Sequence, residues 1–230
     1  MSTNTLTTHK SSKPYKGLAM EGVIAKWYAK NTGRAPEQTL IFNKVKGAIS
    51  ANANILEVAP GPGFLSIEFA KAGKYKVTAL EISRTFIEIA QENARQANVN
   101  IDFRHGNASE MPFEENRFDF IVCVAAFKNF TEPVEAIREM HRVLKSGGKA
   151  CIMDLRRDVS FEDVNHHIKN DLHISGLNAL FTKLVFKTTL LKNAYTKAEI
   201  QNFVSKTNFK QANILEDALG MDIWLEKQTA

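Results

Sequence analysis

The chain has 230 residues, of which 44% are hydrophobic and 24% charged, values typical of a globular protein with one domain and at most a modest appendage. Two cysteines exclude a disulfide scaffold, no apolar run approaches the ~18 residues of a membrane span, and the N-terminus lacks the apolar core of a secretory signal. We therefore expect a cytoplasmic protein without a membrane span.

The formal net charge of +5 is concentrated near the N-terminus. Residues 1–50 contain eight Lys or Arg and two Asp or Glu, whereas residues 51–155 contain twelve and fourteen. Because residues 51–155 are slightly acidic, the charge distribution argues against a nucleic-acid partner. The first residues are rich in Ser, Thr and Lys and have little to bury, so we predict a disordered tail over 1–16.

Helical patterns follow the tail, and we interpret residues 17–50 as a helical cover with a break at 31–36. Strands are then predicted over 55–59, 77–80, 101–104, 118–124, 150–153, 210–215 and 222–225. Helices are predicted over 64–72, after Ser83, from 131 to the glycine pair 147–148, and after Thr196, which begins a capping box. Residues 159–191 lack strand-like runs and are predicted to form a helical insertion.

This alternation predicts an α/β fold: a doubly wound, Rossmann-like, mostly parallel seven-stranded sheet with helices on both faces. We place it in one domain over 51–230. Cys123 and Cys151 lie inside apolar strand runs, so we interpret both as core cysteines.

A glycine-rich loop follows the first predicted strand and precedes a helix. Glycines allow a ligand to approach the backbone, and the helix N-terminus favours a negative ligand group. Glu81 ends the second predicted strand, 20 residues after Gly61, about where an acidic side chain reaches a ribose in nucleotide-binding folds. Ser66 stands where a dinucleotide fingerprint would place its third glycine, which points away from a pyrophosphate-binding turn.

Four segments in this order carry a resemblance to a known family: ILEVAPGPG, ALEIS, GNASEMPF followed by RFDFIVCV, and EAIREMHRVLKSGGKACIMD. Over about 100 residues, the chain resembles the core of class I S-adenosylmethionine-dependent methyltransferases, the broad group that includes ubiquinone and menaquinone methyltransferases. The resemblance implies S-adenosyl-L-methionine as cofactor, and it makes 51–230 the methyltransferase domain.

The resemblance also implies cofactor contacts, position by position. Those to the methionine portion would come from the loop residues Glu57, Ala59, Gly61 and Gly63 and from the backbone of Val124 and Ala125. Those to the ribose and adenine would come from Glu81, Ile82, Asn107 and Ala108.

Two of these positions depart from the family's usual pattern. Ala59 replaces the first glycine of the loop, and its methyl group is tolerable if the residue keeps a negative φ. Asn107 stands where Asp is common, and its amide oxygen can still accept a hydrogen bond from the adenine amino group.

The acceptor side is predicted from the regions that contact acceptors in this family. They are the N-terminal segment, the loop after the fourth strand and the insertion, and they give Tyr15, Trp27, Phe127 and Lys128 as substrate-binding candidates. His167 and His173 of the insertion are candidate general bases because an imidazole titrates near neutral pH, although surface histidines on a polar helix face are the simpler interpretation. The insertion offers only an incomplete set of metal ligands, and the sequence has no H-E-x-x-H motif. Both observations argue against a metal site.

These features predict methyl transfer from S-adenosylmethionine to a small-molecule acceptor, by in-line displacement of an O, N or C nucleophile on the sulfonium methyl. An RNA or protein methyltransferase is the alternative that the basic N-terminal segment motivates. A non-catalytic, cofactor-binding regulatory protein is motivated by Ala59 and Asn107. A nicotinamide-dependent oxidoreductase is disfavoured by Ser66 and by the third and fourth segments. The oligomeric state is left open.

Overall fold

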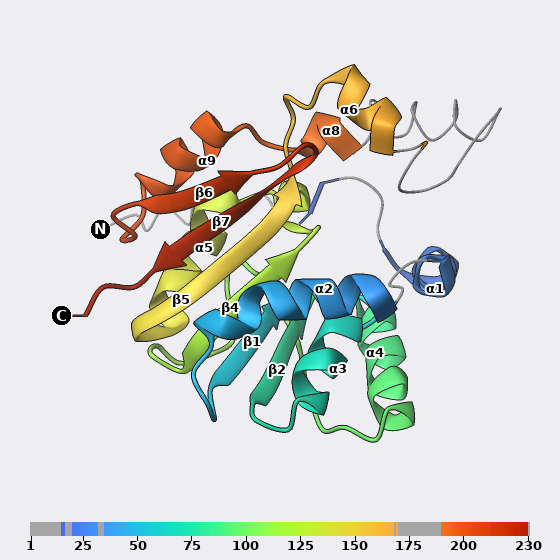
Figure 1. Ribbon diagram of the computed structural model, residues 1–230. Helices are drawn as coiled ribbons and strands as arrows, with labels where there is room; N and C mark the ends of the chain where they lie inside the picture. Colours follow the sequence, from blue (N-terminus) through green and yellow to red (C-terminus); the bar gives the residue numbers. More distant parts are fainter. Residues whose placement is uncertain (1–14, 17–19, 32–34, 168, 170–189, 230) are drawn as a thin grey trace, which may run out of the picture.

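The computed structural model describes residues 15–16, 20–31, 35–167, 169 and 190–229 (Figure 1). A seven-stranded sheet in the order β3-β2-β1-β4-β5-β7-β6 forms its centre. The strands are β1 (Asn54–Val58), β2 (Lys76–Glu81), β3 (Asp102–His105), β4 (Phe118–Val124), β5 (Leu144–Leu155), β6 (Ala212–Glu216) and β7 (Gly220–Glu226). Strands β1 to β5 pair in parallel, whereas β7 runs antiparallel to both β5 and β6. The α/β, Rossmann-like prediction is confirmed, with a mixed sheet in which β7 runs opposite to the other strands.

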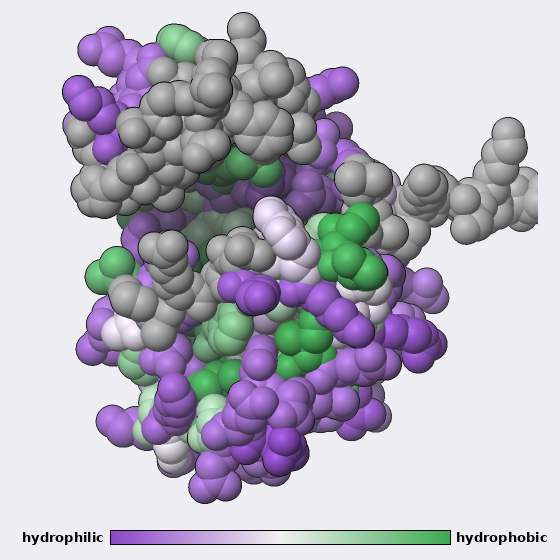
Figure 2. Space-filling model, turned by 90° about the vertical axis from the view of Figure 1, so that its right-hand side faces the viewer, coloured by the Kyte–Doolittle hydropathy of each residue, from purple (hydrophilic) through white to green (hydrophobic). Residues whose placement is uncertain are grey.

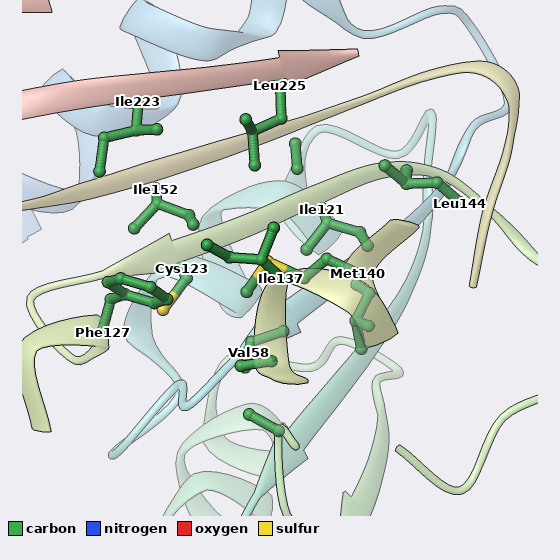
Figure 3. Packing of buried hydrophobic residues seen from close by; sticks show 14 of the residues in the cluster. Val58, Ile121, Cys123, Phe127, Ile137, Met140, Leu144, Ile152, Ile223 and Leu225 are labelled. Carbon is green, nitrogen blue, oxygen red and sulfur yellow. The ribbon is translucent and has the colours of Figure 1, made fainter. Parts of the chain in front are cut away.

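The buried apolar residues form two clusters, one on each face of the sheet, because successive residues of a strand point to opposite faces. On one face, α2 (Ala35–Val45) and α3 (Phe64–Lys71) contribute Val45, Leu65 and Phe69. The other face is covered by α5 (Pro133–Val143) and α9 (Lys197–Val204). Figure 3 shows Ile137 and Met140 of α5 among side chains of the strands.

Two further helices, α4 (Arg84–Gln96) and α1 (Gly22–Asn31), lie beside the sheet and α3 (Figure 1). Helix α4 contacts α3, β2 and β3, and α1 packs on α4. Short 3-10 helices are η1 (Lys46–Ala48) and η2 (Phe127–Asn129). The Ser83 hydroxyl caps α4 by accepting from the backbone N–H of Phe86 at 3.1 Å, and the capping box at Thr196 is present, as predicted.

One predicted boundary is wrong. Helix α5 ends at Val143 rather than at the glycine pair, because Leu144 already pairs with Phe118 in the sheet. Gly147 and Gly148 lie instead within β5, where the pairing register shifts; Gly147 has φ +74°, and a Cβ on Gly148 would come within 2.8 Å of the Lys145 carbonyl oxygen.

Much of the predicted tail and insertion lies outside the described residues. Within 159–191, the described part includes α6 (Phe161–His166), and α8 (Leu191–Asn193) begins at its end. In the described parts of the chain, no helix is both long and apolar enough to cross a bilayer. Cys123 and Cys151 are buried and unpaired, as predicted, and burial raises the pKa of both thiols.

Candidate cofactor site

The loop between β1 and α3 is shaped by three residues with positive φ: Ala59 (57°), Gly61 (54°) and Gly63 (79°). A Cβ on Gly63 would lie 2.8 Å from the Cβ of Ala90 in α4, so only glycine fits where this loop packs on α4. A Cβ on Gly61 would meet nothing within 4 Å. The backbone at Gly61 therefore borders open space, as a loop that receives a ligand must.

Ala59 does not have the negative φ that would make its methyl group tolerable in this loop. Its φ of 57° lies in the left-handed region, where an L-residue is disfavoured by contact between its Cβ and its own backbone. The conformation is maintained by the Ala59 N–H, which donates to the Leu80 carbonyl at 2.8 Å and so joins the ends of β1 and β2. The glycine usual at this position would avoid the strain.

We therefore expect Ala59→Gly to stabilise the protein by about 1 kcal/mol, because the left-handed penalty disappears. The free energy of unfolding in urea measures the effect. Ala72→Gly is the matched control: Ala72 has φ −62°, so glycine there should destabilise by about 0.5–1 kcal/mol. Equal destabilisation by both substitutions would contradict the strain at Ala59.

Glu81 is a buried carboxylate at the carboxyl end of β2. Its Oε1 accepts hydrogen bonds from the backbone N–H groups of Ile82 and Ser83, at 2.8 and 2.9 Å, and its Oε2 accepts from Gly61 at 3.0 Å. Burial raises the pKa of Glu81, while these three donors oppose the rise. Of the roughly four lone-pair positions of a carboxylate, three are occupied, so Oε2 retains capacity for a hydroxyl donor. This arrangement fits a ribose hydroxyl.

Glu57 is the second buried carboxyl group of the site, at the adjacent end of β1. The hydroxyl of Ser66, in the first turn of α3, donates a hydrogen bond to Glu57 Oε2. Burial raises the pKa of Glu57 to about 7, and the charge of Glu81 adds to the rise. In the sequence, Ser66 was noted only because it stands where a dinucleotide fingerprint has a glycine. In the structure, it is the hydrogen-bond partner of Glu57.

This pKa predicts a pH dependence of stability. A carboxyl with a usual pKa of 4.5 and a folded pKa of about 7 favours the folded state most below about pH 4.5, and this contribution is lost as the pH rises through about 7. Relative to Glu57→Gln, the wild-type protein should lose up to about 1.4 kcal/mol per pH unit over this interval. Urea unfolding at a series of pH values measures it, with the exposed Glu88→Gln as control. A difference that is constant with pH would refute the raised pKa.

The remaining cofactor candidates lie on the carboxyl ends of neighbouring strands. Asn107 and Ala108 follow β3, and Val124 and Ala125 lie at the end of β4. Ala125 has φ 56°, and its N–H donates to the Met153 carbonyl at 2.8 Å. The Asn107 amide oxygen accepts from the Ser109 N–H at 3.1 Å, so it already stabilises its own turn. The structure therefore brings the predicted cofactor residues to one edge of the sheet.

The N-terminal segment is attached on either side of β1. Tyr15 forms a bridge with Phe130, and the Lys16 N–H donates to the Asn129 carbonyl at 2.7 Å. Beyond the three undescribed residues, the Met20 carbonyl accepts from the Ser83 hydroxyl at 2.6 Å, and the Glu21 carboxylate accepts from the Arg84 N–H at 3.0 Å. These contacts connect the loops after β4 and β2.

Glu21 caps α4 from a distance in sequence. It also accepts from the backbone N–H of Thr85, at 3.1 Å, and a negative charge at a helix N-terminus is favourable. Sequence reasoning missed this role, because no local pattern connects residues 63 and 64 positions apart.

The acceptor-side candidates divide into two groups. Tyr15, Phe127 and Lys128 lie together at the loop after β4, where Phe127 is buried against Phe130 and Tyr195. Trp27 is on α1 and is 65% exposed. Of the two catalytic candidates, His167 directly follows α6, and His173 lies outside the described residues.

Lys128 is not the accessible cation that its prediction as a substrate contact requires. Its ammonium group is buried, at 2.7 Å from Asp154 Oδ1 and 2.6 Å from the Ala125 carbonyl oxygen. Asp154 Oδ2 also accepts from the Lys128 backbone N–H at 2.8 Å. Sequence reasoning missed Asp154, although an acidic residue at the end of an apolar strand run is the same signal that identified Glu81.

A second polar pair on this side joins Lys16 to Tyr195. The Lys16 ammonium donates to the Tyr195 hydroxyl and lies 4.5 Å from the centre of its ring. The Tyr195 ring also packs edge-to-face on Phe203 at 4.9 Å. Across the described ranges, no group of three or more His, Cys, Asp or Glu side chains is placed to hold a metal ion.

Comparisons with known proteins relate this chain to methyltransferases. Residues 56–152 match the family model described as a methyltransferase domain. Over 108 residues, the chain is 34% identical to the demethylmenaquinone methyltransferase of Listeria welshimeri, covering 45% of this chain and 46% of that protein. Over 107 residues, it is 33% identical to a ubiquinone/menaquinone biosynthesis C-methyltransferase of Shewanella sediminis, covering 45% and 43%. The matched part of the chain thus spans a little under half the length of these relatives.

Solved structures share the fold over most of the chain. A Methanococcus maripaludis protein assigned to the S-adenosyl-L-methionine-dependent methyltransferases has a TM-score of 0.70 at 24% identity, with 90% of this chain and 93% of that chain covered. A methyltransferase from Aquifex aeolicus that depends on S-adenosylmethionine has a TM-score of 0.62 at 16% identity, with 85% and 100% covered.

The fold is thus that of a Rossmann-like α/β protein, and the candidate site lies at the carboxyl edge of its sheet. Within this fold, residues 56–152 match a methyltransferase domain, and this match indicates S-adenosylmethionine as the cofactor.

Proposed function

We propose that this protein transfers a methyl group from S-adenosylmethionine to a small, partly apolar acceptor. The single observation that carries the proposal is Glu81, a buried carboxylate with one open acceptor position beside the Gly61 backbone, inside the part that matches a methyltransferase domain. A nicotinamide cofactor would also have a ribose, so the match and the absence of the third glycine at Ser66 favour S-adenosylmethionine.

In this proposal, the protein acts mainly by orienting the cofactor and the acceptor. The cofactor, when bound, supplies a methyl group that its sulfonium charge has already activated. Glu81 fixes the ribose, the backbone of the β1–α3 loop and of Ala125 borders the methionine portion, and the acceptor is aligned with the methyl–sulfur bond. Orientation of this kind provides up to ~7–11 kcal/mol.

The aromatic side chains after β4 support a partly apolar acceptor. Phe127, Phe130 and Tyr195 form a cluster there, with Lys16 as its cation. The curated relatives act in quinone biosynthesis by name, and a quinol or another phenol is an acceptor of this chemistry. A phenol must lose its proton, and a base contributes ~100–10,000-fold; His167 and His173 remain the predicted candidates.

Two measurements on the full chain test the proposal. In calorimetric titrations, S-adenosylmethionine and its demethylated product should bind, and NAD should not. Labelled S-adenosylmethionine should then transfer its methyl group to at least one member of a panel of phenols, amines and quinol analogues. If NAD bound and the other two compounds did not, the assignment of S-adenosylmethionine as cofactor would be overturned. If the cofactor bound but no methyl group were transferred to the panel or to the small molecules of a cell extract, a regulatory role would be favoured. Methylation of RNA would identify the alternative class.

A further inference from the structure

The ammonium group of Lys16 connects the N-terminal segment to the segment that precedes α9. It donates a hydrogen bond to the Tyr195 hydroxyl, lies 4.5 Å from the centre of the same ring, and is 3.5 Å from the Lys128 carbonyl oxygen. Both Lys16 and Tyr195 are partly buried. A cation and a hydroxyl group from residues 179 positions apart in the chain are thus held against each other, and we call them the Lys16–Tyr195 pair.

Each member of the pair is fixed by contacts of its own. The Lys16 backbone N–H donates to the Asn129 carbonyl at 2.7 Å. The Tyr195 ring packs against Phe127 and Phe203, with ring centres 5.9 and 4.9 Å apart. Because the backbone of one residue and the ring of the other are held, the two polar groups meet in a defined geometry. A ligand that binds them has little side-chain ordering left to induce.

The pair has donor capacity that the described residues do not use. An ammonium group has three N–H donors, and a phenolic hydroxyl group can donate as well as accept. The Tyr195 hydroxyl accepts from Lys16 and donates to none of the described residues. The contact of Lys16 with the Lys128 carbonyl, at 3.5 Å, is long for a hydrogen bond. A ligand oxygen beside both groups would therefore accept from each of them.

The charge of Lys16 favours an anionic ligand. In the part of the chain that the structure describes, its ammonium group forms no ion pair with a carboxylate. The carboxylates of the neighbouring segments are engaged or exposed: Asp154 and Glu199 form ion pairs at 2.7 and 2.6 Å, and Glu132 is exposed. A partly buried cation with neutral acceptors alone has lost hydration without gaining a counter-charge. An anionic oxygen would supply that charge, and charge-assisted hydrogen bonds are roughly twice as strong as neutral ones.

The pair lies near the backbone that is predicted to border the methionine portion of the cofactor. Lys128, whose carbonyl oxygen is close to the Lys16 ammonium, places its own ammonium 2.6 Å from the Ala125 carbonyl oxygen, directly after β4. Figure 2 views the molecule from the side to which the carboxyl ends of β4 and β5 point in Figure 1. It shows a hollow in which hydrophobic and hydrophilic side chains are both visible. Only Lys128 separates the pair from Ala125.

We propose that Lys16 and Tyr195 form a binding site for an anionic oxygen of the acceptor, a carboxylate or a phenolate. Lys16 supplies the charge and one donor, and the Tyr195 hydroxyl supplies a second donor. Lys16 thus takes the role of substrate-binding cation that was predicted for Lys128, whose ammonium group is occupied by Asp154. The assignment of the ligand as the acceptor rests on the proposed methyl transfer, whereas the anion site stands on the contacts of the pair.

Calorimetric titration of the full-length protein with three nitroarenes of similar shape tests the site. 4-Nitrobenzoate is a carboxylate, 4-nitrophenol is a phenol that is ionised at mildly alkaline pH, and 4-nitroanisole is a neutral ether. Each is titrated at mildly alkaline pH, with and without the demethylated cofactor. We expect at least one of the two anions to bind about tenfold or more tightly than the ether. The anion that binds more tightly indicates whether the acceptor offers a carboxylate or a phenolate.

Variants assign this preference to the pair. Lys16→Met removes the charge and should reduce the preference for an anion to less than about twofold. Tyr195→Phe keeps the ring contacts and removes one donor, so it should weaken anion binding by about three- to tenfold without changing the affinity for the ether. Lys192→Met, at an exposed lysine of α8, and Tyr75→Phe, directly before β2, are the matched controls and should change each Kd less than about twofold.

The colour of 4-nitrophenol gives a second readout, because only its anion is yellow. A cation beside the bound oxygen favours the anionic form, so the bound phenol should ionise at a lower pH than the free phenol. Lys16→Met should abolish this shift. If thermal unfolding shows that Lys16→Met is not folded, Lys16→Gln, which keeps a donor without the charge, takes its place in both measurements.

Two results would overturn the proposal. One is that neither anion binds more tightly than the ether. The other is a preference for an anion that persists in the folded Lys16 variant, which would place the anion at another cation of the protein. Failure of the proposed function is recognised separately, by the lack of cofactor binding or of methyl transfer, because the nitroarene titrations without cofactor require neither.

Discussion

Replacing Asp154 with alanine is expected to lower the free energy of unfolding by about 3–5 kcal/mol, a large share of the total stability of a typical domain. The reason is the buried ammonium group of Lys128, whose side chain is 6% exposed beside an Asp154 side chain that is 5% exposed. Without the carboxylate, this charge loses its partner in a region that water does not reach. Urea unfolding of the wild-type and variant proteins measures the loss.

Two controls separate a lost ion pair from lost packing. The double variant Lys128→Met/Asp154→Asn removes both charges but keeps an amide oxygen that can accept from the backbone N–H of residue 128, so it should recover a large part of the stability. Lys71→Ala breaks a pair with Glu68 in which the lysine side chain is 53% and the glutamate side chain 21% exposed, and it should cost less than about 1 kcal/mol. If Asp154→Ala were no more destabilising than Lys71→Ala, the buried pair would be refuted.

The second large effect concerns cofactor affinity. Glu81→Ala should weaken binding of the demethylated cofactor by about 1.5–3 kcal/mol, roughly tenfold to a hundredfold in Kd, because it removes charge-assisted hydrogen bonds to the ribose. Glu81→Gln retains the shape and one acceptor oxygen, so it should lie between alanine and the wild type. Calorimetric titration measures each Kd.

The substitution also leaves the backbone N–H groups of Gly61, Ile82 and Ser83 without their acceptor. Thermal unfolding must therefore confirm that the variants are folded at the titration temperature. Glu88→Ala, at an exposed position on α4, is the control for a lost carboxylate and should leave the Kd unchanged. A folded Glu81→Ala protein with wild-type affinity would show that Glu81 is not the ribose contact.

The strands and the glycine loop were predictable because their signals are local. β4 was predicted with its observed limits, since a run of seven mostly apolar residues directly after Arg117 has one simple interpretation. Gly61, Gly63 and Glu81 were placed at the site because the carboxyl ends of parallel strands share one edge.

Features that depend on long-range contacts were not predictable in the same way. The sequence contains both Lys128 and Asp154, but only the pairing of β4 with β5 brings them together. The positive φ of Ala59 likewise follows from a hydrogen bond to the neighbouring strand rather than from the preference of alanine.

The two cysteines can report when either face of the sheet opens to solvent. Cys123 and Cys151 are in adjacent strands but point into the clusters on opposite faces. Such thiols react with a maleimide only when their face of the sheet becomes accessible, so each labelling rate reports the free energy of opening on one side. In single-cysteine variants, the labelling rate of each thiol can be measured with and without the cofactor. If the cofactor slows labelling of one thiol more than the other, the difference shows which layer of helices opens more readily, and no cysteine has to be introduced.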